Sequence, residues 1–298
     1  MKAAVVEKYG PPEGLRIKEV ETPIPKDNEL LVKIHATTVT YGDAALRRMR
    51  FPVRMVFGLF MGGLGKNKIM GHEFAGEVEA IGSDVISFKS GDQVFGSTGL
   101  KGGAHAEYIC LPQDSMMTIK PKIMTFEEAA AVPIGGNTAY DILRRANILE
   151  EQKVLIYGAS GSVGSYAVQL AKHWGAEVTG VSTNLDLVEE LGADHAINYK
   201  IEDFTERGIS YDVIFDAVRK LSSSHARRTL TESGTFLSVG SPTKESVENL
   251  LFLKELIEAR SLKPVIDRTY PLEEIVEAHR YVDTGRKKGN VVITLNQI

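Results

Sequence analysis

The chain has 298 residues, more than one typical domain, and its length predicts two domains. Hydrophobic residues make up 43% and charged residues 25%, as in ordinary globular proteins, and the formal charge of −4 gives no bias toward nucleic acid. No apolar stretch is long enough to span a membrane, and no signal segment precedes the first strand pattern. The single cysteine, Cys110, excludes an intramolecular disulfide. Together these features predict a cytoplasmic protein.

The first part of the chain, residues 1–121, has short alternating apolar runs divided by glycine-containing turns such as Ser90–Gly91–Asp92. This pattern predicts a small barrel-like domain. Its expected strands are Lys2–Val6, Glu29–Ala36, Glu73–Ile81, Gln93–Gly96 and Ala106–Leu111.

The segment Phe51–Met61 is strongly apolar. It could form a flap that makes a substrate pocket apolar, or it could pack on its own domain or on a partner subunit. Arg50 and Arg54 alone make a poor basic face, so the segment does not favour a membrane-surface role.

From about Thr125, helical patterns alternate with short apolar strands, which predicts a parallel sheet with helices on both faces. The expected strands are Lys153–Tyr157, Glu177–Val181, His195–Tyr199, Asp212–Ala217 and Thr235–Val239. After about Ser246 we expect a helix Leu250–Ala259, a strand Lys263–Asp267, a helix Leu272–Asp283 and a final strand Gly289–Leu295.

The strand Lys153–Tyr157 runs into a glycine-rich turn and then a helix that continues to about Trp174. Glycines three residues apart let backbone N–H groups and a helix N-terminus approach a pyrophosphate, and a second apolar run follows at the distance typical of a βαβ unit. On spacing alone, an ordinary glycine-rich turn is the alternative. The predicted cofactor-binding residues here are Gly158, Ala159, Ser160, Gly161, Ser162, Val163 and Gly164.

The choice of cofactor is expected to depend on the end of the next strand, where NAD-selective enzymes usually carry an acidic residue. Here the chain reads Ser182, Thr183 and Asn184, all neutral, and Asp186 comes too late. The sequence therefore favours NADP over NAD.

Several motifs occur in a recognisable order: Gly71–His72–Glu73, Gly91–Asp92–Gln93–Val94, the glycine-rich turn, Leu191–Gly192–Ala193–Asp194 and Val276–Glu277–Ala278–His279. In this order they resemble the medium-chain dehydrogenase/reductase superfamily, and most of all its zinc-independent quinone oxidoreductase-like branch. The resemblance implies an α/β fold with a GroES-like β-rich barrel domain and a doubly wound Rossmann domain, in a homodimer. The implied division is residues 1–121 for the GroES-like domain, 122–247 for the Rossmann domain and 248–298 for a return to the first domain.

The resemblance also bears on zinc, which related enzymes hold with cysteine, histidine and a further cysteine or acidic group. His72 matches the histidine ligand, but Thr40 stands at the first cysteine position and the Gly135–Gly136 region offers no second cysteine. With only Glu73 beside it, His72 makes no convincing tetrahedral site, so we expect no catalytic zinc and interpret His72 as a hydrogen-bonded histidine.

Without a metal, hydride transfer from a nicotinamide is easiest onto a carbon conjugated to a carbonyl, as in a quinone or an enone. The resemblance places the loop from Thr38 to Asp43 beside the nicotinamide. The candidate catalytic residues are Tyr41 as a hydrogen-bond donor to the developing enolate, Arg47 to orient it, and Asp43, chiefly as an acceptor that orders the loop. A packed aromatic with a satisfied hydroxyl is the alternative for Tyr41.

Two further positions complete the predicted cofactor-binding set. Thr138 matches a position near the nicotinamide in the family, with helix capping as its alternative role, and Gly240 follows the strand Thr235–Val239. The predicted activity is NADPH-dependent reduction of a quinone, an enone or another small apolar carbonyl compound. The alternatives are a zinc-type alcohol dehydrogenase and a non-catalytic NADPH-binding protein.

The connection after Val239 is unusually short, because Gly240 to Glu245 lead almost directly into the next helix. The resemblance predicts another crossover and a sixth strand there. Either the sheet is truncated, or residues are missing at this point, and we favour the second because the segment Ser182–Asn184 also looks short. A continuous backbone through both places would refute missing residues.

Overall fold

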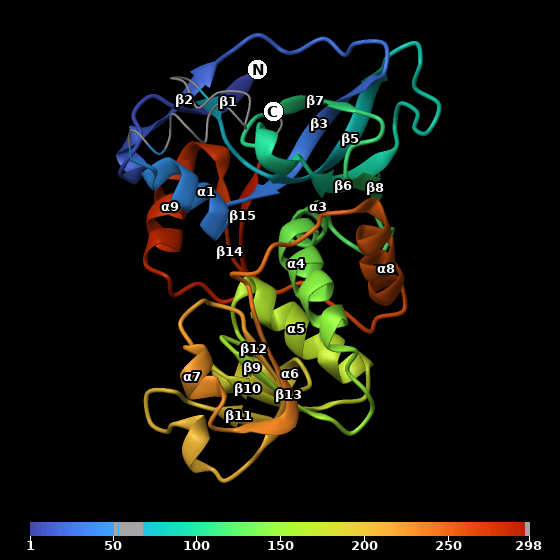
Figure 1. Cartoon of the computed structure of the whole chain (residues 1–298). Helices are drawn as coiled ribbons and strands as arrows, with labels where there is room; N and C mark the ends of the chain where they lie inside the picture. Colours follow the sequence, from blue (N-terminus) through green and yellow to red (C-terminus); the bar gives the residue numbers. More distant parts are fainter. Residues whose placement is uncertain (51–52, 54–67, 296–298) are drawn as a thin grey trace. The chain divides into compact units, whose positions relative to one another are not determined.

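A computed structural model describes residues 1–50, 53 and 68–295, and the chain divides into two compact units. Unit 1 comprises Met1–Ile134 and Ile266–Ile298, and unit 2 comprises Gly135–Val265 (Figure 1). The apolar segment Phe51–Met61, apart from Val53, lies outside the described residues.

Unit 1 is built on two sheets, as the barrel-like pattern predicts. The larger sheet has the order β14 (Ile266–Pro271), β15 (Asn290–Thr294), β3 (Glu29–Thr38), β5 (Glu73–Ile81), β6 (Gln93–Ser97) and β8 (Met117–Ile119), with β7 (Tyr108–Pro112) also paired to β3. The smaller sheet has the order β2 (Leu15–Glu19), β1 (Lys2–Val6) and β4 (Lys68–Ile69). Alternate strand residues such as Val32, Ile34 and Phe74 have no exposed surface and form one apolar core.

Three helices complete the described part of unit 1: α1 (Tyr41–Arg48), α3 (Phe126–Ala130) and α9 (Ile275–Asp283). Thr125 and Glu128 cap each other at the start of α3, and this helix contacts β3 and β5. Unit 1 therefore continues beyond the predicted boundary at residue 121.

Unit 2 contains a five-stranded parallel sheet, which confirms the predicted Rossmann-like domain. Its order is β11 (His195–Ile197), β10 (Glu177–Val181), β9 (Lys153–Tyr157), β12 (Tyr211–Asp216) and β13 (Leu230–Ser238). The helices are α4 (Pro133–Leu143), which starts just before the unit boundary, α5 (Ser162–His173), α6 (Leu185–Glu190), α7 (Ser223–Ala226) and α8 (Val247–Glu258).

Helix α8 belongs to unit 2, although the sequence predicts a return to the first domain at residue 248. Asn249 donates a hydrogen bond to the side-chain oxygen of Asn137 at 2.9 Å, and the backbone N–H of Lys263 donates to Gln169 at 2.8 Å. These polar contacts between segments distant in sequence hold the tail on unit 2 as far as Val265.

The short connection after β13 is a continuous turn in the structure. The N–H of Ser241 donates to the carbonyl oxygen of Ser238 at 2.9 Å, and the chain enters α8 without forming another strand. The segment Ser182–Asn184 is continuous too, with the N–H of Asn184 donating to the Ser182 hydroxyl at 3.0 Å. Within residues 135–265 the sheet therefore has five strands, and no sixth strand follows β13.

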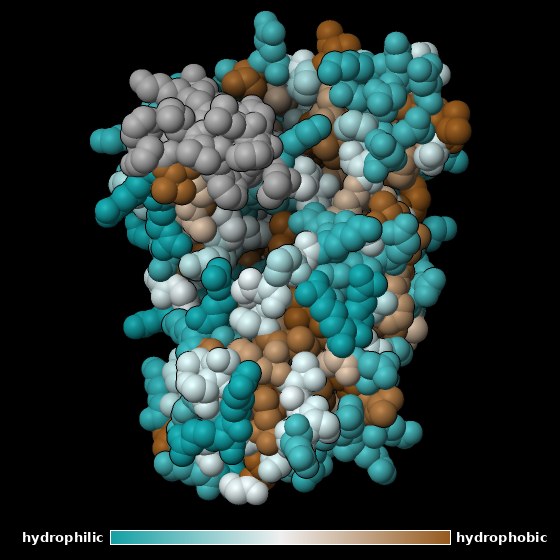
Figure 2. Space-filling model, in the orientation of Figure 1, coloured by the Kyte–Doolittle hydropathy of each residue, from teal (hydrophilic) through white to brown (hydrophobic). Residues whose placement is uncertain are grey.

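Among the described residues, no helix is long and apolar enough to cross a membrane. The face of the molecule in Figure 2 carries its apolar residues in separate groups among hydrophilic ones. The most exposed large apolar side chains, Ile24, Ile86 and Ile201, lie far apart in the sequence.

Candidate functional site

The turn between β9 and α5 requires glycine at two of its three glycine positions. Gly158 has φ = 84°, and a Cβ atom there would lie 2.5 Å from Cγ1 of Val218. A Cβ atom at Gly164 would lie 2.1 Å from the carbonyl oxygen of Gly158. At Gly161, in contrast, the nearest atom would be that same oxygen at 3.4 Å, an ordinary van der Waals distance, so this glycine has room for a Cβ atom. The first and third glycines shape the turn, and the second leaves it accessible.

The accessible side of this turn is the N-terminus of α5. Gly161 is its N-cap residue, and no side chain caps the helix. The Gly161 N–H donates to the carbonyl oxygen of Gly158 at 3.0 Å, so a phosphate group at this helix end would meet the first turn of α5 beyond it, where N–H groups lack partners within the helix. Ala159 does not share this role, because it is fully buried and its N–H donates to Val181. These features fit the pyrophosphate of a dinucleotide.

Not all of the polar side chains predicted at the end of β10 are available to bind a cofactor. Ser182 is only 3% exposed and donates to the hydroxyl of Ser160 at 2.7 Å, so these two residues hold each other. Thr183 is exposed and Asn184 is half-buried at the N-terminus of α6. The side chains left to meet a ribose or its phosphate are therefore those of Thr183 and Asn184, and both are neutral.

The two remaining predicted cofactor residues also lie in unit 2. Thr138 is half-buried in the middle of α4, so the alternative that it caps a helix is wrong. Gly240 lies in the turn after β13, where a Cβ atom would come 3.3 Å from Nε of Arg219. The sequence did not single out Arg219.

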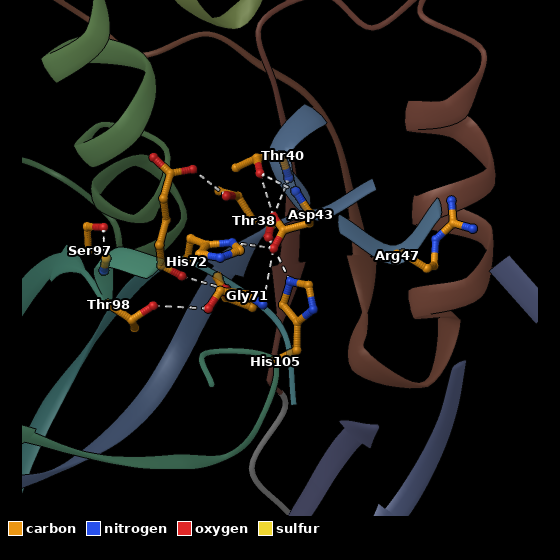
Figure 3. A network of polar contacts seen from close by, with 12 residues as sticks. Thr38, Thr40, Asp43, Arg47, Gly71, His72, Ser97, Thr98 and His105 are labelled. Atoms are coloured by element: carbon orange, nitrogen blue, oxygen red, sulfur yellow. Dashed lines mark hydrogen bonds and ion pairs between the residues drawn. The ribbon is translucent and has the colours of Figure 1, made fainter. Parts of the chain in front are cut away.

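In unit 1, a polar cluster surrounds Asp43 (Figure 3). The Asp43 carboxylate accepts hydrogen bonds from the Thr40 N–H at 2.8 Å, the Thr40 hydroxyl at 2.6 Å and the Gly71 N–H at 3.1 Å, and Nδ1 of His72 lies 2.6 Å from it. Burial raises the pKa of this carboxyl, but His72, His105 and Thr40 outweigh that effect and hold the pKa well below its usual range.

This arrangement corrects the inclusion of Asp43 among catalytic residues. Asp43 has no exposed surface, and its hydrogen bonds fix the start of α1, the Gly71 N–H and the ring of His72. The prediction that Asp43 orders the loop and that His72 is a hydrogen-bonded histidine agrees with this geometry. His72 itself is 8% exposed.

Arg47 is also displaced from its expected role. Its side chain has no exposed surface and points away from the Asp43 cluster in Figure 3. The guanidinium donates to the carbonyl oxygen of Gly10, to Asp283 and, at 3.3 Å, to Nδ1 of His279. A buried guanidinium with these partners ties α1 to α9 and cannot touch a substrate, which corrects the orienting role expected from sequence.

The hydrogen bond from Arg47 also defines the protonation of His279. Because Nδ1 accepts, the proton of the neutral ring lies on Nε2, which has no partner among the described residues. Burial, together with the neighbouring His105, lowers the pKa of His279 to about 3, so the ring is neutral at physiological pH.

Tyr41 is the one predicted catalytic residue that solvent reaches. It begins α1 and is 67% exposed, with the guanidinium carbon of Arg48 5.7 Å from its ring centre. This exposure argues against the alternative of a packed aromatic. Its hydroxyl is therefore free to meet a substrate that docks on this face of α1.

Glu73, which the sequence analysis considered only as a possible metal ligand beside His72, is a buried carboxyl group in the structure. It is 1% exposed and accepts hydrogen bonds from the Thr38 hydroxyl and, at 2.6 Å, from the Ile134 N–H. Burial raises the pKa of Glu73 to about 7 despite these two bonds. The burial depends on segments far away in the sequence, so the Gly-His-Glu motif alone carries no signal for it.

Within residues 1–50, 53 and 68–295, no group of three His, Cys, Asp or Glu side chains is placed to hold a metal ion. Thr40, at the position of the first cysteine ligand, is engaged with Asp43 as the N-cap of α1. The described residues do not fit a catalytic zinc, and the absence of zinc stays a prediction.

Comparisons with known proteins agree with both units. Residues 26–121 match the alcohol dehydrogenase GroES-like domain, and residues 162–266 and 243–293 match two zinc-binding dehydrogenase models. The chain is 33% identical to the 2-methylene-furan-3-one reductase of Solanum lycopersicum, over 98% of this chain and 79% of that protein. It is 30% identical to the chloroplastic NADPH-dependent alkenal/one oxidoreductase of Arabidopsis thaliana, again over 98% of this chain and 79% of that protein.

Among solved structures, the quinone oxidoreductase from Coxiella burnetii is similar with a TM-score of 0.88 and 28% identity, over 99% of both chains. The alignment with the tomato reductase runs over 324 positions, more than the 298 residues of this chain, so the relative has residues in the matched region that this chain lacks. The chain belongs to the quinone oxidoreductase-like branch of the medium-chain dehydrogenase/reductase superfamily and is an NAD(P)-dependent oxidoreductase.

Proposed function

We propose that this enzyme uses NADPH to reduce the conjugated double bond of small apolar enones, with quinones as further substrates. The observation that carries the proposal is the open N-terminus of α5 at Gly161, next to a β10 end without an acidic side chain. The printed names of two relatives, an alkenal/one oxidoreductase and a furanone reductase, support the substrate class.

The nicotinamide of NADPH would supply a hydride to the carbon β to the carbonyl without a metal, and the enolate that results would take a proton from water to give the saturated carbonyl compound. The chain's own task is to orient the substrate and to stabilise the negative charge that develops on the carbonyl oxygen. The exposed Tyr41 hydroxyl serves as the donor to that oxygen. Asp43 and Thr40 act indirectly, because they fix the first turn of α1, which carries Tyr41.

Selectivity for NADPH over NADH follows from Thr183 and Asn184. Neither side chain repels a 2′-phosphate, whereas an acidic residue at this place would bind the ribose hydroxyls and reject the phosphate. NAD is the less favoured cofactor. By family resemblance, we further infer a cytoplasmic homodimer.

A co-substrate screen tests the proposal. NADPH absorbance is followed with enones, quinones, saturated aldehydes and alcohols, and bound metal is measured on the same preparation. Turnover of enones or quinones with no stoichiometric metal supports the proposal. Binding of NADPH without any turnover would instead indicate a non-catalytic protein, and zinc together with alcohol oxidation would indicate an alcohol dehydrogenase.

A further inference from the structure

The loop that follows β12 has an unusual backbone. Arg219 has φ = 56°, in the left-handed region that favours glycine. The buried carboxylate of Asp216 imposes this shape, since it accepts hydrogen bonds from the N–H groups of Val218 and Leu221, both at 3.0 Å. An arginine held in such a conformation is strained, and strained residues of this kind cluster at ligand sites.

The Arg219 guanidinium lies over the turn after β13. A Cβ atom at Gly240 would be 3.3 Å from Nε and 3.7 Å from the guanidinium carbon of Arg219. Arg219 is exposed, and it makes no hydrogen bond or ion pair with any described residue. Its charge thus has no counterpart in the part of unit 2 that the structure describes.

The strand order places the loop that carries Arg219 next to the phosphate-binding turn, because β12 pairs with β9. Tyr157, Asp216 and Ser238 are register partners on the adjacent strands β9, β12 and β13, so the loops that follow them share one edge of the sheet (Figure 1). Val218 packs on Gly158, and Arg219 continues from it toward β13. The end of β10, with Thr183, lies on the opposite side of β9.

We propose that Arg219 binds the pyrophosphate of the dinucleotide on its nicotinamide side; this inference rests on the proposed function. A dinucleotide with its adenosine over β10 and its pyrophosphate at the N-terminus of α5 extends across the ends of β12 and β13, because ligands of such sheets lie outside the carboxyl ends of the strands. The guanidinium there meets a phosphate with a geometry suited to two parallel hydrogen bonds.

The test compares Arg219→Gly, Arg219→Ala and a control in the same loop, Lys220→Ala, by calorimetric titration with NADPH, NADH and 2′,5′-ADP. Both Arg219 variants should bind NADPH and NADH about tenfold more weakly, because a charge-assisted hydrogen bond is lost. Binding of 2′,5′-ADP, which has no pyrophosphate, should not change in any variant. Lys220→Ala should bind all three ligands like the wild type.

Thermal unfolding gives a second readout. Arg219→Gly should melt at a higher temperature than Arg219→Ala, because glycine relieves the left-handed backbone and alanine does not. If the wild type binds NADPH, two results would overturn this inference. One is unchanged binding of NADPH and NADH by both Arg219 variants, and the other is a loss of affinity for 2′,5′-ADP as large as that for NADPH. A wild-type protein that binds neither dinucleotide would overturn the proposed function itself.

Discussion

The Oδ1 atom of Asp43 lies 2.6 Å from Nδ1 of His72, and Asp43 has no exposed surface. The same carboxylate accepts from the N–H and the hydroxyl of Thr40 and from the N–H of Gly71. One buried charge thus joins the start of α1 to the strand that carries Glu73. The hydrogen-bond partners of Asp43 come from two segments about thirty residues apart in the sequence, so removal of this charge should destabilise unit 1 as a whole.

Asp43→Asn should lower the free energy of unfolding by about 3 kcal/mol, because an amide nitrogen replaces one of the accepting oxygens and leaves buried donors unpaired. Urea unfolding of both proteins measures the change. Asp114→Asn, at an exposed position, is the control and should change stability by less than about 0.5 kcal/mol. An Asp43→Asn variant as stable as this control would contradict the role assigned to Asp43.

Glu73 should make the stability of the protein fall as pH rises. Its pKa is about 7 in the folded protein and 4.5 in a solvated chain, so the folded state binds the proton more tightly. The contribution of protonated Glu73 to the free energy of unfolding is fully present below the lower pKa. It decreases as pH rises from the lower to the higher pKa, by up to about 3 kcal/mol in total. Glu73→Gln keeps a neutral group and should not show this loss.

The measurement is the difference in unfolding free energy between wild type and Glu73→Gln at pH 5 and at pH 8. Other titrating groups are common to both proteins and cancel in the difference. Glu21→Gln, an exposed change, should leave the pH dependence of the wild type intact. Parallel stability curves for wild type and Glu73→Gln would show that Glu73 has an ordinary pKa.

The sequence predicted the local features of the fold well. The bounds of β1, β5, β9 and β10 agree with the expected strands, because each is a short apolar run with clear turns around it. The glycine-rich turn was predictable from its spacing, since the close contact at Gly164 is with Gly158 in the same turn, whereas the contact of Gly158 with Val218 joins distant segments.

The remaining features depend on contacts between distant segments. Arg47 is exposed or buried according to whether α9 packs on α1, and nothing in the residues around Arg47 shows this. The compact units differ in their bounds from the domains expected from sequence for the same reason, since α3 packs on β3 and Asn249 donates a hydrogen bond to Asn137. The left-handed backbone of Arg219 arises from the buried Asp216 carboxylate and was equally hidden.

Gly161 and Gly164 should respond differently to the same substitution. Gly164→Ala should reduce stability strongly, because its Cβ would lie 2.1 Å from a backbone oxygen that cannot move away. Gly161→Ala should fold with nearly normal stability, because the closest atom would be 3.4 Å away, yet bind NADPH about tenfold more weakly or worse. Thermal unfolding and calorimetry on both variants measure these effects. If Gly161→Ala kept full affinity, the pyrophosphate would have to bind elsewhere.

A negative charge at the end of β10 should reverse the cofactor preference. Thr183→Asp should weaken NADPH binding by about tenfold or more, since a carboxylate and a phosphate a few ångströms apart repel each other by on the order of 1 to 4 kcal/mol. NADH lacks that phosphate and should bind as before. Thr183→Ala keeps the neutral charge and should retain the preference for NADPH. Equal losses for both cofactors with Thr183→Asp would show that Thr183 does not face the 2′-phosphate.

Removing the Tyr41 hydroxyl should slow turnover modestly. Tyr41→Phe should lower kcat severalfold, since one neutral hydrogen bond contributes on the order of 1 kcal/mol, and should leave NADPH affinity unchanged. Wild-type kinetics in Tyr41→Phe would remove Tyr41 from the reaction.

The origin of the hydrogen atom added to the substrate tests the central claim most directly. The enzyme is given an enone with NADPH that carries deuterium at the transferable position of the nicotinamide, and the product is analysed by NMR. The account predicts a saturated ketone with one deuterium on the carbon β to the carbonyl. Deuterium on the carbonyl carbon of an alcohol product, or a saturated ketone without deuterium, would contradict it.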